Sequence, residues 1–294
     1  MNSNTEMVSA VITTHNRLGL LKRAIDSVLS QTYANIECIV VNDASTDGTD
    51  EYCKSRDDIR LISIPKSESH GGNHARNLGI RAASGEYVAF LDDDDAWLPT
   101  KTEKQVALLK EKNCECVYCL RKKQVYINNR LIKEYPETQK YAFEGDLSKK
   151  VFRHFITSTS CILAKKSLLE EIGGFDENLL KIQDYELLIR IAQKTQIYYP
   201  HNETLVLYTK NASDKARISN DPKRLPVAKK YIEKKHSELL RQAGLLNRFL
   251  HDAWMWKALY LTARMAGDTP NRIRYGIYYR LAYPIKLFFE KLDL

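Results

Sequence analysis

The order of apolar and amphipathic segments in the first 112 residues constrains the fold more than any other feature. Short apolar runs rich in β-branched residues predict four buried strands, at 7–13, 36–42, 60–65 and 86–92. Helical periodicity or turn residues mark the segments that follow them, at 14–32, 43–49, 73–84 and 98–112. This βαβαβαβα order predicts an α/β fold with a mostly parallel central sheet and helices on both faces.

Polar segments follow three of these strands at their carboxyl ends. Residues 14–16 (THN) follow the first strand, 42–45 (NDAS) the second and 92–95 (DDDD) the fourth. Ligands of open α/β sheets bind outside the carboxyl ends of the strands. We therefore expect a binding site at this edge, and we expect Asn16 to cap the first helix.

The acidic run at 92–95 indicates a metal site. Four adjacent carboxylates repel one another unless something neutralises them. Their hard oxygen atoms suit Mg²⁺ or Mn²⁺, and such a metal usually completes its shell with substrate phosphates. A solvated acidic turn is the alternative, but the position directly after an apolar strand favours the metal.

Two further segments carry groups that suit a nucleotide diphosphate. Asp43 can accept a hydrogen bond from the imide N–H of a uracil ring, or it can form a turn that caps the next helix. The glycines at 71–72 precede a helix containing Arg76, and both helix-start N–H groups and a guanidinium suit phosphate. Three histidines have no spacing that demands a metal: His15, His70 and His74.

The rest of the chain changes from mixed to helical. Residues 115–135 have a β-like pattern, 183–194 predict a helix, and 197–210 alternate as a strand or a hairpin. Beyond residue 222 the pattern predicts three helices, ending near 243 and spanning 245–266 and 271–291.

Positive charge is concentrated in this helical region. The chain holds 45 Lys+Arg and 37 Asp+Glu, and residues 221–294 hold 15 basic and 7 acidic residues. No nucleic-acid motif accompanies the charge, so we expect no nucleic-acid partner. An apolar side on the last helix favours contact with an anionic membrane surface, with packing on the preceding α/β part of the chain or a homodimer contact as alternatives. That side comprises Ile277, Leu281, Ile285, Phe288 and Phe289.

The cysteines and the N-terminus indicate a reducing compartment. The C-x-x-C at 116–119 lacks the second ligand pair of a zinc site, so we expect buried strand cysteines. Neither a secretory signal nor an uncharged apolar run of about 18 residues is visible. We expect a cytoplasmic protein, peripheral on the inner face of the cell membrane if the last helix binds lipid.

Four motifs together resemble one family. They are VSAVITTHNR (8–17), IVVNDASTDGT (39–49), GGNHARNLGIRAASGEYVAFLDDDDAWLP (71–99) and IGGFDENLLKIQDYELLIRIA (172–192). Their order and spacing resemble those of the family-2 inverting glycosyltransferases with the GT-A fold. The resemblance implies a GT-A catalytic domain at 1–215, with a nucleotide-sugar half at about 1–100 and an acceptor half at about 101–215. Residues 216–294 would form a basic, aromatic-rich helical extension.

The resemblance also implies roles for single residues. Asp184 matches the family's catalytic base, while Asp94 and Asp92 match its metal ligands. The residues expected to contact the nucleotide are Thr13, His15, Arg17, Asp43, Arg76 and Asp93. Three positions depart from the commonest family pattern, where Asp, Tyr and Glu are usual: Asn42, His15 and Gln183. The change at Gln183 puts any role of that acid in acceptor binding in doubt.

The implied activity is metal-dependent transfer of a sugar from a nucleotide diphosphate, most often UDP, to a hydroxyl of a glycan or lipid-linked sugar. Mn²⁺ or Mg²⁺ would be the cofactor, and cell-surface polysaccharide biosynthesis the setting. A nucleotidyltransferase is one alternative, but the loop after the first strand (TTHNRLG) is not the Gly-rich, Lys-containing loop such an enzyme would favour. A non-catalytic nucleotide-sugar-binding protein of the same fold is the other, and the presence of Asp94 and Asp184 argues against it.

Overall fold

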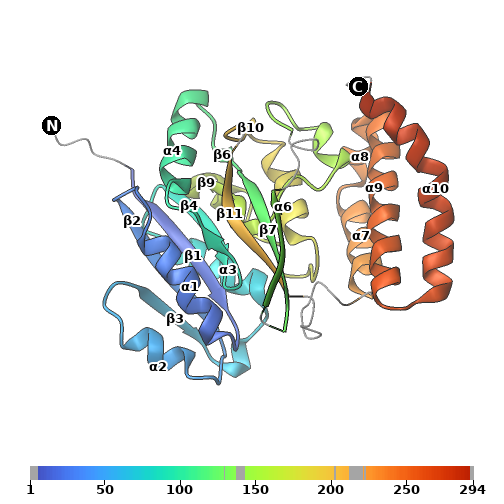
Figure 1. Ribbon diagram of the computed structural model, residues 1–294. Coiled ribbons are helices and arrows are strands. Elements are labelled where there is room, and N and C mark those ends of the chain that lie inside the picture. Colours follow the sequence, from blue (N-terminus) through green and yellow to red (C-terminus); the bar gives the residue numbers. More distant parts are fainter. Residues whose placement is uncertain are drawn as a thin grey trace.

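Two sheets and a C-terminal group of helices make up the protein (Figure 1). The computed structural model describes residues 6–128, 130–136, 143–201, 203–211, 221 and 223–291. The larger sheet has seven strands in the order β10-β6-β9-β4-β1-β2-β3. Their bounds are β1 Val8–Thr14, β2 Ile36–Asp43, β3 Arg60–Ile64, β4 Tyr87–Asp92, β6 Cys116–Val117, β9 Leu163–Lys165 and β10 Ile197–Tyr198.

The predicted α/β architecture is confirmed. β1 runs parallel to both β2 and β4, β2 to β3, and β10 to β6, whereas β9 is antiparallel to β4 and β6. The helices and turns of this part connect or flank the strands. They are α1 Leu18–Leu29, α2 Thr49–Lys54, η1 Lys66–Glu68, α3 Gly72–Ala82, α4 Lys101–Lys112, η3 Lys150–Arg153, η4 Thr159–Cys161, α5 Lys166–Glu171 and α6 Gln183–Ile191.

Helices cover both faces of this sheet because its strands are apolar on both sides. In β1, Ala10 and Ile12 join a cluster with residues of α1 and α4, whereas Val11 joins a second cluster with residues of α3 and α6. Gly79 lets α3 approach the sheet closely, since a Cβ there would meet Val11 Cγ1 at 2.2 Å. Because neighbouring side chains of β1 point to opposite faces of the sheet, the core has one apolar layer on each face.

The first helix begins later than predicted, and Asn16 does not cap it. Asn16 has φ +53°, and its side chain accepts the Thr46 N–H at 2.7 Å. α1 begins at Leu18, whose N–H donates to Asp47 Oδ2 at 2.9 Å. A carboxylate from the loop after β2 therefore takes the capping role, because tertiary contact brings the two loops together.

A second sheet, which the sequence did not predict, stands beside the first. Its order is β5-β11-β7-β8, with β11 parallel to β7 and the other two pairs antiparallel. The bounds are β5 Ala96–Trp97, β7 Leu120–Ile127, β8 Arg130–Pro136 and β11 Thr204–Asn211. The hairpin alternative for 197–210 is wrong, because β10 pairs in the first sheet and β11 in the second.

Four helices form the C-terminal part, at one side of the sheets in Figure 1. They are α7 Arg224–Lys235, α8 Ser237–Gln242, α9 Gly244–Met265 and α10 Thr269–Lys291. Trp254 and Met255 of α9 join the core cluster that contains α6, and Trp254 Nε1 donates to Phe152 O at 2.9 Å. α10 packs along α9, with Trp256 stacked on Tyr278.

Apolar side chains of α10 lie on its exposed side, as predicted from its periodicity. The side chains of Ile277 and Leu281 are 55% and 69% exposed, and Ile285 and Phe288 are exposed as well. Among the described residues, no helix combines the length and the apolar character needed to cross a bilayer. The six cysteines are free and buried, as expected.

Candidate active site

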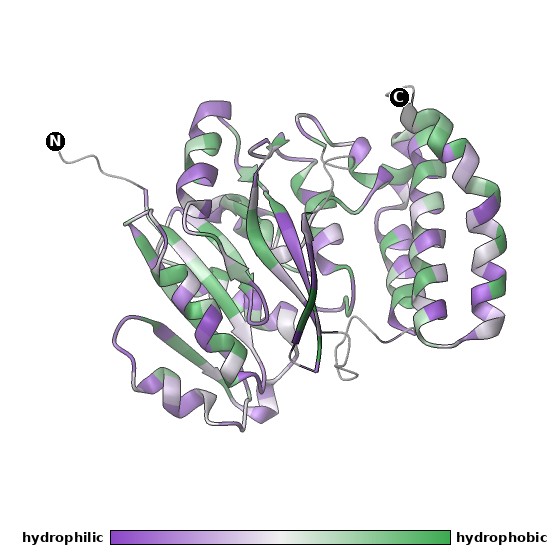
Figure 2. Cartoon of the chain, viewed as in Figure 1, coloured by the Kyte–Doolittle hydropathy of each residue, from purple (hydrophilic) through white to green (hydrophobic). Residues whose placement is uncertain are grey.

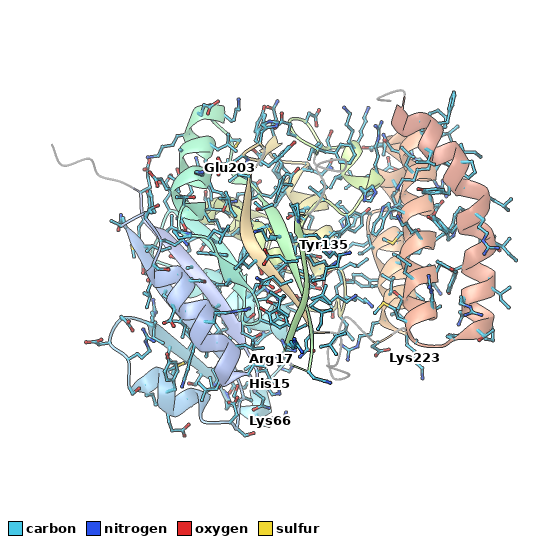
Figure 3. All side chains as sticks on the ribbon, viewed as in Figure 1. His15, Arg17, Lys66, Tyr135, Glu203 and Lys223 are labelled. Carbon is cyan, nitrogen blue, oxygen red and sulfur yellow. The ribbon has the colours of Figure 1, made fainter. Side chains whose placement is uncertain are left out.

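The three polar segments that follow β1, β2 and β4 lie together. The register pairs Thr13 with Asp92 of β4, and Thr14 with Asn42 of β2. β1 is the strand from which the chain order runs in opposite directions, to β2 on one side and β4 on the other, which is where open α/β sheets bind ligands. Figure 3 labels His15 and Arg17 close to each other at the end of β1.

His15 and Asp43 form one side of the site. His15 Nδ1 donates to the Asp43 carbonyl oxygen at 2.5 Å, and Asn16 Nδ2 donates to His15 Nε2 at 3.0 Å. The Asp43 side chain is buried, and its Oδ1 has no hydrogen-bond partner among the described residues. A buried acceptor without a donor is costly, so Oδ1 is ready to accept an N–H from a ligand.

Two arginines neutralise the acidic run. Arg17 Nη1 lies 3.2 Å from Asp93 Oδ1 and 3.4 Å from Asp94 Oδ2, and Arg76 Nη2 donates to Asp92 Oδ1 at 2.7 Å. The argument that repulsion among the four carboxylates requires a cation is therefore incomplete, because the fold itself supplies two positive charges. Both arginines were predicted nucleotide contacts, and both lie at the acidic run.

Asp93 is tied into the protein more firmly than a solvated turn would be. Its Oδ2 accepts from Thr14 Oγ1 at 2.8 Å, in addition to its ion pair with Arg17. Burial raises the pKa of Asp93 to about 6. The alternative of a solvated acidic turn is wrong for this residue, whose side chain is almost fully covered.

Three carboxylates could share a cation, but they differ in availability. Ligand oxygens of Asp92, Asp94 and Asp95 lie within 4.8 Å of one another. Asp95 is fully buried, and its two oxygens accept from Ser160 Oγ at 2.6 Å and the Thr209 N–H at 2.9 Å. These contacts hold Asp95 inside the protein, so Asp92 and Asp94, whose partners at the site include the mobile side chains of arginines, are the pair that could hold Mn²⁺ or Mg²⁺.

Sequence reasoning missed Arg23, which braces the acidic run from α1. Its Nη2 donates to the Asp94 carbonyl oxygen at 2.6 Å and to Thr209 Oγ1 at 2.8 Å. Ser160, which holds Asp95, also accepts the Asp92 N–H at 3.2 Å. No local pattern marks either residue, because both act through contacts formed only in the tertiary structure.

Asp184 lies in the first turn of α6, where it is 8% exposed. Burial raises its pKa to about 6, while the nearby Arg121 and Arg76 oppose that shift and Asp92 adds to it. The residue before the helix, Ile182, has φ +54°, which a β-branched residue rarely adopts. The strained backbone of Ile182 therefore lies two residues before Asp184, and charges of the acidic-run site act on the Asp184 carboxylate.

Residues from the C-terminal helices hold α6 in place. Tyr185 Oη lies 3.0 Å from His251 Nδ1 of α9. Glu186 is fully buried and accepts from Arg190 Nη2 at 2.6 Å, with Lys235 Nζ at 2.8 Å and His236 Nε2 at 3.0 Å. Those hydrogen bonds and the charge of Arg190 keep the pKa of Glu186 well below its ordinary value despite its burial.

This geometry defines a class of protein: an α/β fold with an acid-rich, arginine-braced site at the sheet's switch point and one more buried carboxylate beside it. The family model "Glycosyl transferase family 2" matches residues 9–173, and the chain belongs to this family. The predicted family and GT-A fold are thereby confirmed.

Individual relatives agree with this assignment. An uncharacterised glycosyltransferase of Rickettsia typhi is 34% identical over 203 residues, which cover 68% of this chain and 63% of the relative. The chain is 27% identical to Escherichia coli WfgD, a UDP-Glc:α-D-GlcNAc-diphosphoundecaprenol β-1,3-glucosyltransferase, over 65% of this chain and 72% of that protein. The fold is shared with the mannosyltransferase PcManGT from Pyrobaculum calidifontis, solved with GDP-Man and Mn²⁺ (TM-score 0.57, 18% identity, 99% and 87% of the two chains).

Proposed function

We propose that the protein is a metal-dependent inverting glycosyltransferase that moves a sugar from a UDP-linked donor to a hydroxyl of a glycan or lipid-linked sugar. The observation that carries this proposal is the buried Asp184 in the first turn of α6, close enough to Asp92 and Arg76 of the strand-edge site for their charges to act on its carboxylate. WfgD uses UDP-Glc and a lipid-linked acceptor, and PcManGT was solved with Mn²⁺, which supports the donor class and the cofactor. We place the catalytic domain at 1–215, divided near residue 100.

The donor would lie across the ends of β1, β2 and β4. The orphaned Oδ1 of Asp43 would accept the imide N–H of uracil, beside the His15 ring and Thr13. Arg17 and Arg76 would turn from the carboxylates toward the diphosphate, while Asp92 and Asp94 would hold Mn²⁺ or Mg²⁺. When bound, the metal neutralises charge that develops on the leaving diphosphate.

Transfer would proceed by one displacement. The acceptor oxygen bonds to the anomeric carbon as Asp184 takes the hydroxyl proton, and the bond from that carbon to the diphosphate oxygen breaks with its electron pair. Attack opposite the leaving group inverts the anomeric configuration, and no covalent intermediate with the enzyme forms. A base with a pKa near 6 is ionised at neutral pH and still basic enough to assist the attack.

Replacing the base tests this mechanism. We expect Asp184→Asn to lower transfer about 10²–10⁴-fold, as for loss of a general base, while the Kd for UDP with Mn²⁺ stays within about twofold. The measurements are product formation over a panel of UDP-sugars and UDP binding by calorimetry. Glu177→Gln is a matched control, because that acid contacts Asn77 and His74 away from the acidic run. A variant at Asp184 that keeps more than half the activity would remove this residue from the mechanism.

We also propose that α10 contacts the inner face of the cell membrane. Its exposed apolar residues lie among Arg274 and Arg280, which are exposed too, and such a helix suits an anionic bilayer surface. Replacing both Ile277 and Leu281 with Gln should reduce co-sedimentation with phosphatidylglycerol vesicles several-fold. Val227→Gln, an exposed apolar position on α7, is the control. Equal binding by both proteins would exclude this helix as the anchor.

A further inference from the structure

A lysine is buried in the core of the protein without a hydrogen-bond partner. Lys101, at the start of α4, is fully buried, and its Nζ makes no hydrogen bond within the described residues. The ammonium lies 3.9 Å from the centre of the Trp97 ring, a contact that orders a cation without neutralising its charge. An unpaired buried charge is costly, so an anion that forms next to this ammonium is stabilised. The groups whose negative charge acts on Lys101 are the thiols of Cys119 and Cys161, once ionised.

The two thiols face each other at the end of a strand pair. β6 and β9 are antiparallel with Val117 opposite Leu163, and the same register two residues further on places Cys119 opposite Cys161. The pairing continues to this point, because the Cys119 N–H donates to the Cys161 carbonyl oxygen at 3.1 Å. A hydrogen bond also joins the two thiols. Both cysteines are free and buried in the apolar cluster beside α4, next to the first sheet, whose central strands Figure 2 shows as largely hydrophobic.

The surroundings of Cys161 favour its thiolate. Burial alone raises the pKa of Cys161, but the hydrogen bond from Cys119 and the charge of Arg121 outweigh burial, and the pKa lies below its ordinary value. Ser158 Oγ, 3.7 Å from the Cys161 sulfur, is a further hydrogen-bond partner. The pKa of Cys119 is raised well above its ordinary value, chiefly by burial. A thiolate beside a neutral thiol is the arrangement of a redox-active pair, because the thiolate attacks the oxidant and the second thiol resolves the product.

The turn that contains Cys161 also holds the acidic run. In η4, Ser160 Oγ donates to Asp95 Oδ2 at 2.6 Å and accepts the Asp92 N–H at 3.2 Å. Directly opposite residues of antiparallel strands have Cβ atoms about 4.5–5.5 Å apart, whereas a disulfide needs about 3.5–4.5 Å. Closing a disulfide between Cys119 and Cys161 therefore draws η4 toward the end of β6. Because Ser160 directly precedes Cys161, this movement displaces a group on which the positions of the carboxylates depend.

We propose that Cys119 and Cys161 are an oxidation site, at which peroxide closes a disulfide that weakens the binding of metal and nucleotide at the acidic run. The inference adds regulation to the proposed transferase function and rests on that function only for the effect on UDP binding. Lys101 stabilises the thiolate that starts the reaction. Because both sulfurs are covered, the oxidant has to be as small as hydrogen peroxide.

The chemistry needs only the two thiols and one peroxide. The Cys161 thiolate attacks one peroxide oxygen, the O–O bond breaks with its electron pair, and a sulfenic acid and hydroxide form. The Cys119 sulfur then bonds to the sulfenic sulfur as the S–O bond breaks, and the departing hydroxide takes the Cys119 proton. The first hydroxide takes the proton that Cys161 released. The two sulfurs are oxidised to the disulfide, and the peroxide is reduced to two molecules of water.

Peptide mapping of the full-length protein after treatment with hydrogen peroxide tests the site. Free thiols are alkylated before digestion, and we expect a linked pair of peptides containing Cys119 and Cys161, which dithiothreitol separates. Lys101→Met removes the cation and should slow formation of this disulfide about tenfold, the change that accompanies a shift of one pKa unit in the thiol. Cys53→Ala, at a buried free thiol of the same apolar cluster, should leave the rate unchanged. An equal rate in Lys101→Met would exclude the role given to Lys101.

Calorimetry of UDP with saturating Mn²⁺ measures the effect on the acidic run. Peroxide should raise the Kd of the wild-type protein for UDP about tenfold, the cost of one hydrogen bond to a charged group, and dithiothreitol should restore it. Peroxide should not change the Kd of Cys119→Ala, because the disulfide cannot form in this variant.

A wild-type protein that yields no linked peptide pair, or whose affinity for UDP is the same when oxidised and when reduced, would overturn the proposal. So would an equal rise of the Kd in Cys119→Ala, because the loss would then come from another oxidised residue. Sugar transfer by the reduced wild-type protein is measured in parallel. Its absence would count against the transferase function and not against the disulfide, since the mapping needs no activity.

Discussion

At the scale of single residues, burial sets the acidity of two carboxylates that have different surroundings. The pKa values of Asp93 and Asp184 are both raised to about 6. Asp93 is held by Thr14 and Arg17, which fix its position in the acidic run. Within the described part of the chain, Asp184 Oδ1 accepts a hydrogen bond from the N–H of the adjacent Tyr185 and no other donor reaches this carboxylate. That difference suits Asp93 to orienting neighbours and Asp184 to accepting a proton.

The pH dependence of transfer should report the titration of Asp184. The base works only when ionised, so kcat/KM should fall about tenfold per pH unit below about pH 6 and level off above it. The profile is measured under saturating Mn²⁺. Asp93 titrates in the same range, so Asp93→Asn is the control. This variant should still show the fall of kcat/KM below about pH 6. A flat profile from pH 5 to 8 would contradict Asp184 as the base.

Asp43 should determine base recognition rather than the rate of the chemical step. Asp43→Ala removes the orphaned acceptor, so we expect the Kd for UDP to rise about tenfold, the cost of one hydrogen bond to a charged group. The kcat at saturating donor should change little. Competition by UDP and by ADP measures the effect, because the variant should lose preference for uracil. A Kd for UDP equal to that of wild type would show that the carboxylate does not meet the base.

At the scale of elements, α6 depends on the C-terminal helices. Three cationic side chains converge on Glu186: Arg190 from α6 itself, and Lys235 and His236 from the end of α7. Tyr185 reaches α9 on the same helix turn. The C-terminal helices therefore brace the helix that carries Asp184, whatever they contact on their outer side.

Replacing this buried acid should lower stability strongly. Glu186→Gln leaves the cations without their carboxylate, and we expect the free energy of unfolding to fall by about 3 kcal/mol in urea denaturation at pH 7. Glu238→Gln, which breaks an exposed pair with Arg241, should change it little.

The effect of Glu186 should also depend on pH, with a defined sign. Its folded pKa lies well below the ordinary value of 4.5, so its stabilisation is fully present above that pH and is lost as the pH falls toward the folded pKa. The stability difference between wild type and Glu186→Gln should therefore shrink below about pH 4.5. A constant difference from pH 7 to pH 3 would argue against the ion pairs as its source.

At the scale of the whole molecule, the site is assembled from both sheets. Thr209 of β11 donates its N–H to Asp95, which follows β4, and Arg23 of α1 bridges the same two segments. The acidic run is thus the junction of the first sheet, the second sheet and α1. A ligand that binds this junction stabilises the whole protein by mass action.

Thermal unfolding should reveal this linkage. UDP with Mn²⁺ should raise the Tm by several degrees, more than the two do separately, because the metal joins the diphosphate to Asp92 and Asp94. EDTA should remove the part of the Tm shift that depends on Mn²⁺. Asp94→Asn should abolish this metal-dependent part of the shift, whereas Glu177→Gln should retain it. An equal shift with and without metal would contradict a metal-bridged diphosphate.

Local sequence patterns were enough to predict the α/β class, the four leading strands and the meeting of three polar segments at one edge. Those features depend on periodicity and chain order, which are local, and on the rule that parallel strands end at a common edge. Asp43 could be singled out because it follows a strand directly. Asp184 could be placed only through resemblance to a family, since an acid at a helix start is common.

The partners of these residues, by contrast, follow from the packing of the folded chain. Arg23, Ser160 and Thr209 reach the acidic run from segments distant in the chain, and their sequence surroundings have no distinguishing pattern. The same holds for the second sheet, because β11 joins β5 and β7 across about 80 to 110 positions of chain. Periodicity reports which side of an element is apolar, whereas a side-chain contact depends on how elements pack, and that is set by the whole chain at once.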